Sequence, residues 1–277
     1  MDASQDSPAP QNTIKLGAGF PADHAEKLAR AIVFLVFLLS VTYTLHAAHG
    51  MSGGMKMPGG WIMPMMWMVM PGHTVAGSAF LFLVVWEAMM VAMMLPSAWP
   101  MLQLYGRVAR HTGQGRPTVN TISAGAGYFA VWGIFGAIAF AIGLEISSVA
   151  MASPRLSREI PAAAGVSLVL AGLWQLSPLK QVCLKHCREP LMFLAHAYKP
   201  GAWGAFRVGL HHGAFCAACC WALMVIQMVL GVMNLTVMIV VATMIAAEKL
   251  WKRGPFLARA IGLSSIAAGV FLLARSI

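Results

Sequence analysis

The sequence predicts an all-α protein, a polytopic transmembrane helical bundle of about seven spans, with six to eight as the range. Three observations lead to this fold class. Of the 277 residues, 59% are apolar and only 10% are charged, whereas a soluble domain carries about 25% charged residues. The mean hydropathy is +0.73. Apolar segments with few charges recur along the chain at the roughly 17–25 residues that a helix needs to cross a bilayer.

The predicted spans divide the chain into a tail and one helical domain. Residues 1–29 are polar and are expected to form a cytoplasmic N-terminal tail, partly disordered, while residues 30–277 form the helical transmembrane domain. A secretory signal starts with a short basic segment, so we expect the first span to stay uncleaved. The fourth span is short, and the last two leave room for tilted or partly re-entrant segments. In chain order, the spans cover residues 30–48, 75–98, 122–143, 162–177, 207–231, 235–250 and 257–274.

The net charge of +10 is unevenly distributed between the two sides of the predicted membrane. With the N-terminus in the cytoplasm, 15 of the 19 lysines and arginines lie in inner segments and 4 lie in outer segments. This asymmetry follows the positive-inside rule and predicts a multi-pass protein of the cell (inner) membrane with its C-terminus outside. The basic balance is therefore topological, and nucleic acid is not expected as a partner. All five cysteines fall in cytoplasmic or membrane positions, where we expect them to be reduced.

The outer loop 49–74 is rich in methionine and glycine. It contains eight of the 21 methionines, with His46 and His49 at its start and His73 at its end. Thioether sulfur is a soft, neutral ligand that favours Cu(I), and it works outside the cell where thiols would oxidise. Alternatively, the segment Trp61 to Met68 is an interfacial half-helix that rests its apolar side chains on lipid.

The second span contains a carboxylate among paired methionines. Glu87, Met90 and Met94 share one helix face because three and four residues separate them. An ionised carboxylate near mid-span costs at least ~2.5–3.5 kcal/mol, so it must be protonated or find a cation. We predict metal binding at these three residues, although the methionines alone could simply fill gaps in a bundle.

The fifth span carries soft ligands inside a segment predicted to cross the membrane. Three of the five cysteines fall within five residues, and two adjacent histidines precede them. Steps of three to five residues place a histidine, two cysteines and a methionine on one helix face. The alternative is that the thiols pack as small apolar groups against a close neighbouring helix. The predicted ligands are His211, His212, Cys216, Cys219, Cys220 and Met224.

The inner loop 178–206 holds the other two cysteines. Cys183 and Cys187 are one turn apart if Pro178 starts a short helix, and together with His186 they are predicted metal ligands. Basic neighbours are expected to lower the pKa of both thiols. The haem-attachment signature is Cys-X-X-Cys-His, so this pattern excludes covalent haem, while a basic surface loop with incidental thiols stays open. The basic neighbours are Lys180, Lys185 and Arg188.

The sixth span has polar residues at both ends. Asn234 is predicted to cap a helix or to form a tight outer turn. Glu248 and Lys249 are interpreted as an ordinary interfacial pair, with a position facing a cavity as the less favoured alternative. We therefore assign no metal ligand to this span.

Three stretches of the chain match the pattern of a known family. They are Glu87 to Pro96 with its paired methionines, Gln175 to Arg188, and Gly209 to Lys249, and they span most of residues 80–250. In these stretches the chain resembles a bacterial family of predicted metal-binding integral membrane proteins, catalogued as domain of unknown function 2182. The resemblance implies metal binding by a membrane protein, but it implies neither the metal nor the activity.

The favoured hypothesis is an integral membrane protein that handles Cu(I), through uptake, relay or delivery to a membrane partner. Ligand strength would rise inward, from the outer thioethers and histidines, through the second span, to the cysteines. Zinc, iron and manganese stay open as alternative metals. The expected partners are the lipid bilayer, the metal ion, and other membrane subunits or a metallochaperone. No catalytic residue is assigned, and a binding protein is favoured over an enzyme.

Two other classes of function stay open at this stage. The chain could be an accessory or structural subunit of a membrane metalloenzyme or respiratory complex, in which the ligands only help to build the assembly. It could also be a membrane oxidoreductase that uses a metal or a quinone. No nucleotide-binding motif occurs in the sequence, so active transport would need an ion gradient or another subunit.

Overall fold

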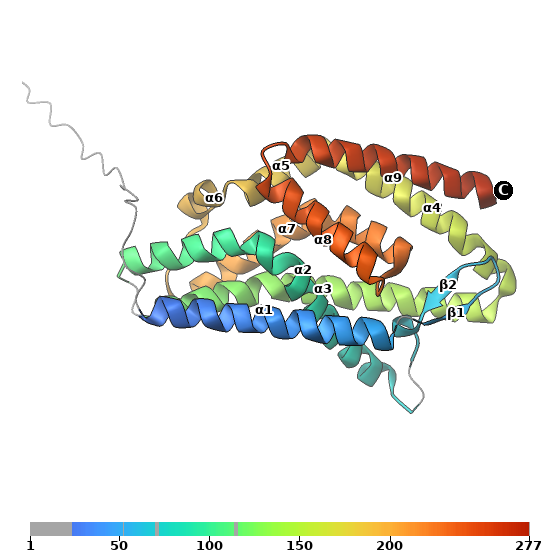
Figure 1. Cartoon of the computed structure of the whole chain (residues 1–277), viewed down its shortest axis with the longest axis horizontal. Coiled ribbons are helices and arrows are strands. Elements are labelled where there is room, and N and C mark those ends of the chain that lie inside the picture. Colours follow the sequence, from blue (N-terminus) through green and yellow to red (C-terminus); the bar gives the residue numbers. More distant parts are fainter. Residues whose placement is uncertain (1–23, 52, 70–71, 114–115, 277) are drawn as a thin grey trace, which may run out of the picture.

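The computed structural model describes residues 24–51, 53–69, 72–113 and 116–276, and it confirms an all-α helical bundle (Figure 1). A short two-stranded hairpin and one 3-10 turn, η1, interrupt the helices. The helices are α1 (His24–Gly50), α2 (Val75–His111), α3 (Pro117–Ala152), α4 (Pro154–Leu176), α5 (Pro178–Arg188), α6 (Pro190–Ala197), α7 (Gly201–Gly231), α8 (Leu235–Leu250) and α9 (Gly254–Ser276). The remaining elements are β1 (Gly54–Lys56), β2 (Ile62–Pro64) and η1 (Met65–Trp67).

Six helices in the described part of the chain are long and apolar enough to cross a membrane, within the predicted range of six to eight. They are α1, α2, α3, α4, α7 and α9. The span predicted at 235–250 forms α8, which has only 16 residues. At 1.5 Å per residue α8 extends about 24 Å, which is less than the roughly 30 Å of a hydrocarbon core.

Two segments predicted as loops are largely helical. Residues 99–111 continue α2, which runs through Pro96 and Pro100 to His111. Proline removes a backbone hydrogen bond and kinks a helix rather than always ending it, and the two halves of α2 run in different directions in Figure 1. The segment 178–206 forms α5 and α6. The predicted tail at 1–29 also overlaps α1, since α1 begins at His24, and residues 1–23 lie outside the described part.

Proline and capping side chains set the start of most helices. A proline occupies the first turn of α3, α4, α5 and α6, where its missing N–H leaves no helix carbonyl without a partner. Side-chain oxygens cap others: Ser177 accepts from the backbone N–H of Lys180, and Asn234 accepts from that of Val237, as predicted for Asn234.

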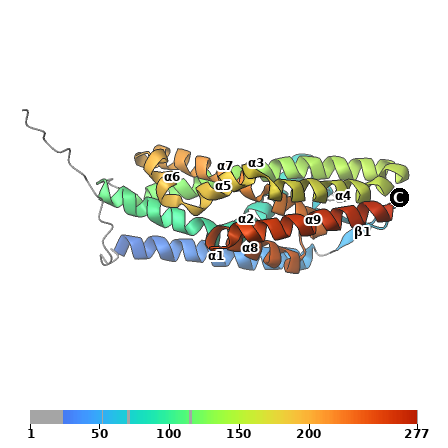
Figure 2. The ribbon, with the colours of Figure 1, turned by 90° about the horizontal axis from the view of Figure 1, so that it is seen from above.

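Close helix pairs are built on glycine. A Cβ added at Gly172 of α4 would lie 2.6 Å from the carbonyl oxygen of Gly262 in α9, and one added at Gly165 would lie 3.0 Å from that of Gly269. Small residues at such positions let two membrane helices approach closely. Figure 2 shows α4 and α9 along the same side of the elongated bundle.

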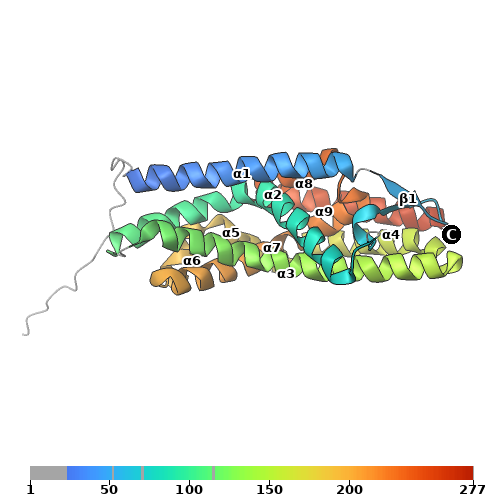
Figure 3. The same cartoon turned by 90° about the horizontal axis from the view of Figure 1, so that it is seen from below.

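The helices differ in how much of their surface they bury. Only 6% of the most apolar stretch of α1 is buried, against 50% for α2 and 44% for α7. In Figures 1 and 3, α1 lies along the outside of the bundle. An exposed, almost wholly apolar helix needs lipid or a partner around it, whereas α2 and α7 carry the interior.

The main core contains many sulfur atoms. Trp86 and Trp132 anchor it, with the indole N–H of Trp86 donating to the carbonyl oxygen of Trp132 at 2.9 Å. Methionines of α2 and cysteines of α7 belong to the same buried cluster, which includes Met89, Met90, Met93, Met94, Cys216, Cys219, Cys220 and Met224.

Candidate metal centre

Two segments that are far apart in the sequence bring four thiols together. Cys216, Cys219 and Cys220 lie on one turn of α7, and Cys187 reaches them from α5. The Sγ atoms of Cys187 and Cys219 are 3.8 Å apart, and those of Cys219 and Cys220 are 3.4 Å apart. Thiolates that share one metal ion through bonds of about 2.3 Å lie roughly 3.8 Å apart in tetrahedral geometry. The first of these two distances equals that of two thiolates on one ion and the second is shorter, and the four thiols are hereafter called the thiol cluster.

The local sequence of α5 explains how Cys187 is presented. Helix α5 starts at Pro178 with Ser177 as its N-cap, so Pro178 does start a short helix, as the predicted one-turn spacing of its two cysteines required. Leu184 is 1% exposed and fixes the buried face of α5. Cys183 and Cys187, one turn apart, pack against the main core from that side. The two cysteine groups predicted as separate sites are therefore adjacent.

A buried lysine completes the surroundings of the thiol cluster. The Nζ atom of Lys249 in α8 lies 2.8 Å from Cys216 Sγ and 3.3 Å from Ser97 Oγ. The hydroxyl of Tyr128 lies 2.8 Å from the same sulfur. A buried ammonium without a counter-charge would be costly, so its contact with Cys216 favours a negatively charged sulfur. The sulfur of Cys216 thus accepts a hydrogen bond from Lys249 and shares a second one with the hydroxyl of Tyr128.

The interpretation of Glu248 and Lys249 as an interfacial pair is wrong. Both side chains are buried, at 1% and 6% exposed, and they make separate contacts. The missed signal is periodic: Met238, Val241, Ile245 and Lys249 occupy the buried face of α8 at helical spacing. A lysine on an apolar face needs a partner inside the protein, and the sequence alone did not indicate which one.

Glu248 belongs to a second buried polar group, beside the thiol cluster. Its Oε2 atom lies 2.6 Å from the Nζ atom of Lys180, and its Oε1 accepts from Gln175 Nε2 at 3.0 Å. Lys180 also donates to Gln175 Oε1. Arg188, at the end of α5, donates to the carbonyl oxygens of Glu248 and Trp251 at 2.6 and 2.7 Å. These contacts hold α5 against α4 and α8.

The basic residues of α5 do not lower the thiol pKa values as predicted. The pKa of Cys187 lies above its ordinary value, first because of its hydrogen bond with Cys216, while the bond with Cys219 acts in the opposite direction and burial adds to the rise. Burial raises the pKa of Cys183. The physical reason is that Lys180 and Arg188 are engaged with α8, so neither directs its charge at the sulfurs.

The predicted ligands of α2 have different positions. Met90 and Met94 are fully buried in the core that also contains Cys216 and Met224. Glu87 is half-buried and faces α3, where a Cβ added at Gly133 would lie 2.7 Å from its Oε1. The methionines therefore share the interior with the thiol cluster, and the described contacts of Glu87 do not include it.

The paired histidines of α7 face different surroundings. His212 is 3% exposed, lies between the rings of Tyr128 and Phe193, and its Nδ1 has no hydrogen-bond partner in the described residues. His211 is exposed and lines a cavity with His186 of α5. Consecutive helical residues point about 100° apart, so the two imidazoles are not directed at one common ligand position.

The methionines of the outer loop are dispersed. Met57 and Met63 pack with Ala150 in a small core of their own, while Met55 and Met65 are exposed. His46, His49 and His73 are all exposed, and Met70 lies outside the described residues. Figure 1 places the β1–β2 hairpin near the C-terminal end of α9 and α5 near its start, so the hairpin lies away from α5, whereas Met66 belongs to the main core.

No closed metal cage exists in the part of the chain that the structure describes: no group of three or more His, Cys, Asp or Glu side chains is arranged to hold an ion. The thiols instead hydrogen-bond to one another and to Lys249.

Comparison with known proteins adds the family. A family model described as "PpoB2: Copper chaperone" matches residues 83–272, a range that contains α3 to α8, most of α2 and α9, and all four thiols of the cluster. No curated protein and no solved structure matches the chain. The match supports copper as the metal, and it leaves the narrower resemblance to domain of unknown function 2182 as a prediction. Since the matched range covers well over half of its length, the chain belongs to the PpoB2 copper chaperone family.

Proposed function

We propose that this protein binds Cu(I) at the thiol cluster in the cell (inner) membrane and holds the ion for delivery to a membrane partner. The observation that carries the proposal is the convergence of Cys187 with Cys216, Cys219 and Cys220 beside a buried lysine. Membership of a copper chaperone family and six long apolar helices support a copper-handling role at a membrane.

Ligand softness favours the monovalent ion. Thiolates and thioethers select Cu(I), and Met90, Met94 and Met224 lie in the same core as the cysteines. Charge balance points the same way. Two thiolates and one Cu(I) ion carry one net negative charge, and the ammonium of Lys249, 2.8 Å from Cys216, would neutralise it. In a buried site an uncompensated charge costs several kcal/mol, roughly, so such pairing matters.

In this proposal the outer loop would capture Cu(I), and the ion would then move inward toward stronger ligands. Its thioethers and the histidines His46, His49 and His73 would hold Cu(I) weakly before it reaches thiolates. Met90, Met94 and Met224 would form the relay through the interior. The orientation of Glu87 toward α3 supports no direct step from that carboxylate to the cysteines.

Copper titration of the detergent-purified protein under anaerobic, reducing conditions tests the proposal. A competing Cu(I) chelator measures affinity, and elemental analysis measures stoichiometry and identifies the metal. The triple change Cys216→Ser, Cys219→Ser and Cys220→Ser should abolish tight binding. Cys183→Ser is the matched control, because Cys183 makes no described sulfur contact with the four thiols. Tight Cu(I) binding that survives the triple change would show that the site is elsewhere.

A further inference from the structure

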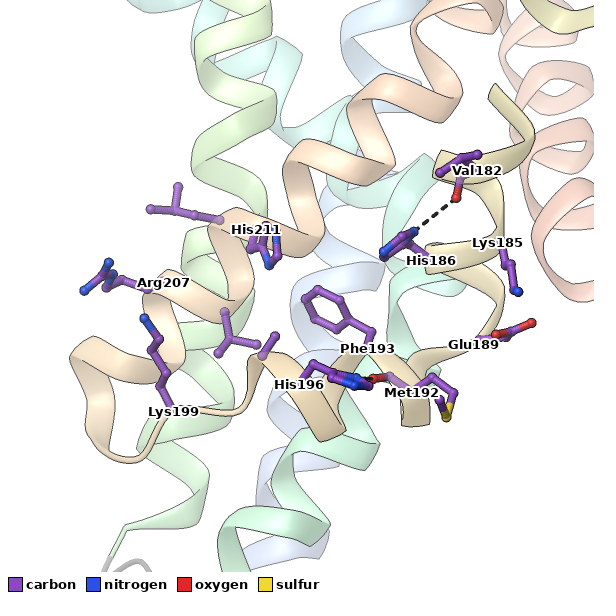
Figure 4. Close-up of a pocket in the computed structure, with 13 residues that line it drawn as sticks. Val182, Lys185, His186, Glu189, Met192, Phe193, His196, Lys199, Arg207 and His211 are labelled. Atoms are coloured by element: carbon purple, nitrogen blue, oxygen red, sulfur yellow. Dashed lines mark hydrogen bonds between the residues drawn. The ribbon is translucent and has the colours of Figure 1, made fainter. Parts of the chain in front are cut away.

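A large cavity lies beside the thiol cluster and is lined by residues of the same two helices, α5 and α7, together with α6. It has a volume of about 1030 Å³ and lies between α5, α6 and α7 (Figure 4). Three imidazoles and a thioether are among the side chains that line it, namely His186, His196, His211 and Met192. These groups bind soft and borderline metal ions. The cavity therefore combines room for a small molecule with metal-binding side chains, and the thiol cluster does not account for it.

Hydrogen bonds determine which nitrogen of two of these imidazoles is available. Nδ1 of His186 lies 3.1 Å from the carbonyl oxygen of Val182, and Nδ1 of His196 lies 2.9 Å from that of Met192. A carbonyl oxygen only accepts, so each Nδ1 carries the hydrogen and each Nε2 keeps its lone pair. The same arrangement orients histidines that bind metal ions through Nε2.

His186 stacks on a ring of α7 next to the thiol cluster. The rings of His186 and Phe215 are parallel, with centroids 4.2 Å apart and an interplanar angle of 2°. His186 directly precedes Cys187, and Phe215 directly precedes Cys216. The ring of His211 packs against Phe215 from the cavity side, with centroids 5.0 Å apart. The stacked rings of His186 and Phe215 thus lie next in sequence to two cysteines of the cluster, and His186 also lines the cavity.

The charge of the cavity indicates what kind of molecule it takes. Lys185, Lys199 and Arg207 line it against a single carboxylate, Glu189. In Figure 4, Lys199 and Arg207 lie at one side of the cavity and His186 lies toward the other. This arrangement suits a small anion that places its carboxylates on the two cations and a soft donor atom near the imidazole.

We propose that the cavity binds an anionic, low-molecular-weight thiolate complex of Cu(I), and that His186 Nε2 is the first protein ligand as the ion passes to Cys187. The inference rests on the proposed function of the thiol cluster. The Cu(I)–sulfur bond to the carrier breaks as a bond to His186 and then one to Cys187 forms. The proton lost by Cys187 passes to the released carrier thiolate, and no electron is transferred. The imidazoles form no closed site, in keeping with a transient station that needs an external ligand.

Stopped-flow measurement of copper transfer tests the proposal, with Cu(I) supplied either as its glutathione complex, which is anionic, or as its acetonitrile complex, which carries no anionic group. His186→Gln should slow loading of the thiol cluster by about tenfold or more with glutathione as carrier, and it should leave the equilibrium affinity within about twofold. His111→Gln is the control, since His111 is an exposed histidine of α2 that does not line the cavity, and this variant should load at the wild-type rate.

The double variant Lys199→Gln, Arg207→Gln tests the anionic carrier separately. It should raise the half-saturating concentration of the glutathione complex by about fivefold or more and leave loading from acetonitrile unchanged. The proposal would be overturned if the double variant loaded more slowly from both carriers to the same extent. It would also be overturned if His186→Gln loaded from the glutathione complex at the wild-type rate. Failure of the proposed function would give a different result, because the wild-type protein would then show no tight Cu(I) binding at equilibrium. Circular dichroism and melting curves confirm that each variant is folded.

Discussion

The outer methionine loop and the inner thiol cluster are the two sulfur-rich regions of the molecule, and only the inner region converges. In the loop, Met57 and Met63 pack around Ala150, while Met55 and Met65 are exposed. In the inner region, α5 crosses α7 so that sulfurs 32 residues apart in sequence lie 3.8 Å from each other. The difference teaches that the density of ligand residues in a sequence says little about whether they meet, whereas two crossing helices bring distant cysteines together.

The largest expected effect separates the two regions directly. Replacing Cys216, Cys219 and Cys220 by Ser should remove tight Cu(I) binding, because serine oxygen is a hard and poorly deprotonated ligand. Replacing Met55 and Met65 by Leu should change the affinity by less than about twofold, because exposed thioethers contribute no buried bond. Chelator competition measures both. A larger loss in the methionine variant would reverse the comparison.

The next effect concerns the scaffold of the inner region. Glu248→Ala leaves Lys180 buried without its counter-charge, and breaking such a pair costs about 3–5 kcal/mol of folding stability. Glu145→Gln, at an exposed position, should change stability by less than about 0.5 kcal/mol. Thermal unfolding in detergent compares them. If both variants melt together, the ion pair does not stabilise the inner region.

Lys249 tests charge compensation at the thiol cluster. Lys249→Met should weaken Cu(I) binding by about 10–100-fold, the range typical of groups that contact metal ligands. Lys249→Arg keeps the positive charge and should restore most of the affinity, which a purely structural role for the side chain would not explain. The ultraviolet thiolate-to-copper absorption of the loaded protein reports on the same site. An unchanged affinity in Lys249→Met contradicts this role.

The two regions should also differ in their response to pH. The pKa values of Cys183 and Cys187 are raised, so these thiols are protonated near neutral pH and any that binds copper must release a proton. The apparent affinity should therefore fall as pH falls, by up to about tenfold per pH unit for each proton released. Thioethers release none, so binding by the outer loop would not vary in this way. A pH-independent affinity argues against thiolate ligands.

The folding stability of the metal-free protein should change with pH in the opposite direction to the copper affinity. A raised thiol pKa favours the neutral form in the folded state, so its contribution to stability is complete below the ordinary thiol pKa of about 8.5 and is lost as pH rises beyond it. Unfolding midpoints of the metal-free protein measured from neutral to alkaline pH should decline. Cys187→Ser should decline less than the wild type.

The smallest effect concerns the attachment of the outer loop. The indole N–H of Trp61 donates to the carbonyl oxygen of Ser157 at 3.0 Å, and Ser157 Oγ donates to the carbonyl oxygen of Pro58 at 2.8 Å. Trp61→Phe should lower stability by about 1 kcal/mol, the net value of one such hydrogen bond, without affecting copper affinity. A loss of copper binding in this variant would assign the loop a direct part in the site.

The sequence predicts the fold well because long apolar segments determine it. The six long helices arise where charges are few, and proline and serine at residues 177–178 predict the start of α5. Composition could not reveal that α2 continues through two prolines, since neighbouring helices stabilise a kinked helix that would end in water. Helix length is thus less predictable than helix number.

The site was predictable in its residue types but not in its geometry. All four thiols of the cluster were among the predicted ligands, yet nothing in the sequence placed Cys187 beside Cys219, because that contact depends on how α5 crosses α7. Lys249 was missed for a related reason. Its buried position follows the periodicity of α8, but its partner, Cys216, is visible only when three helices are packed together.

Helix α5 is fastened at both ends, by Lys180 to Glu248 and by Arg188 to the carbonyl oxygens at the end of α8. Its backbone cannot swing away from α7 without breaking an ion pair and several hydrogen bonds. If the thiol cluster binds Cu(I) as proposed, the ion would therefore enter and leave through rotation of side chains on a fixed backbone. The entropy cost of ordering these side chains would then be met when the chain folds, and copper binding would have to order little more.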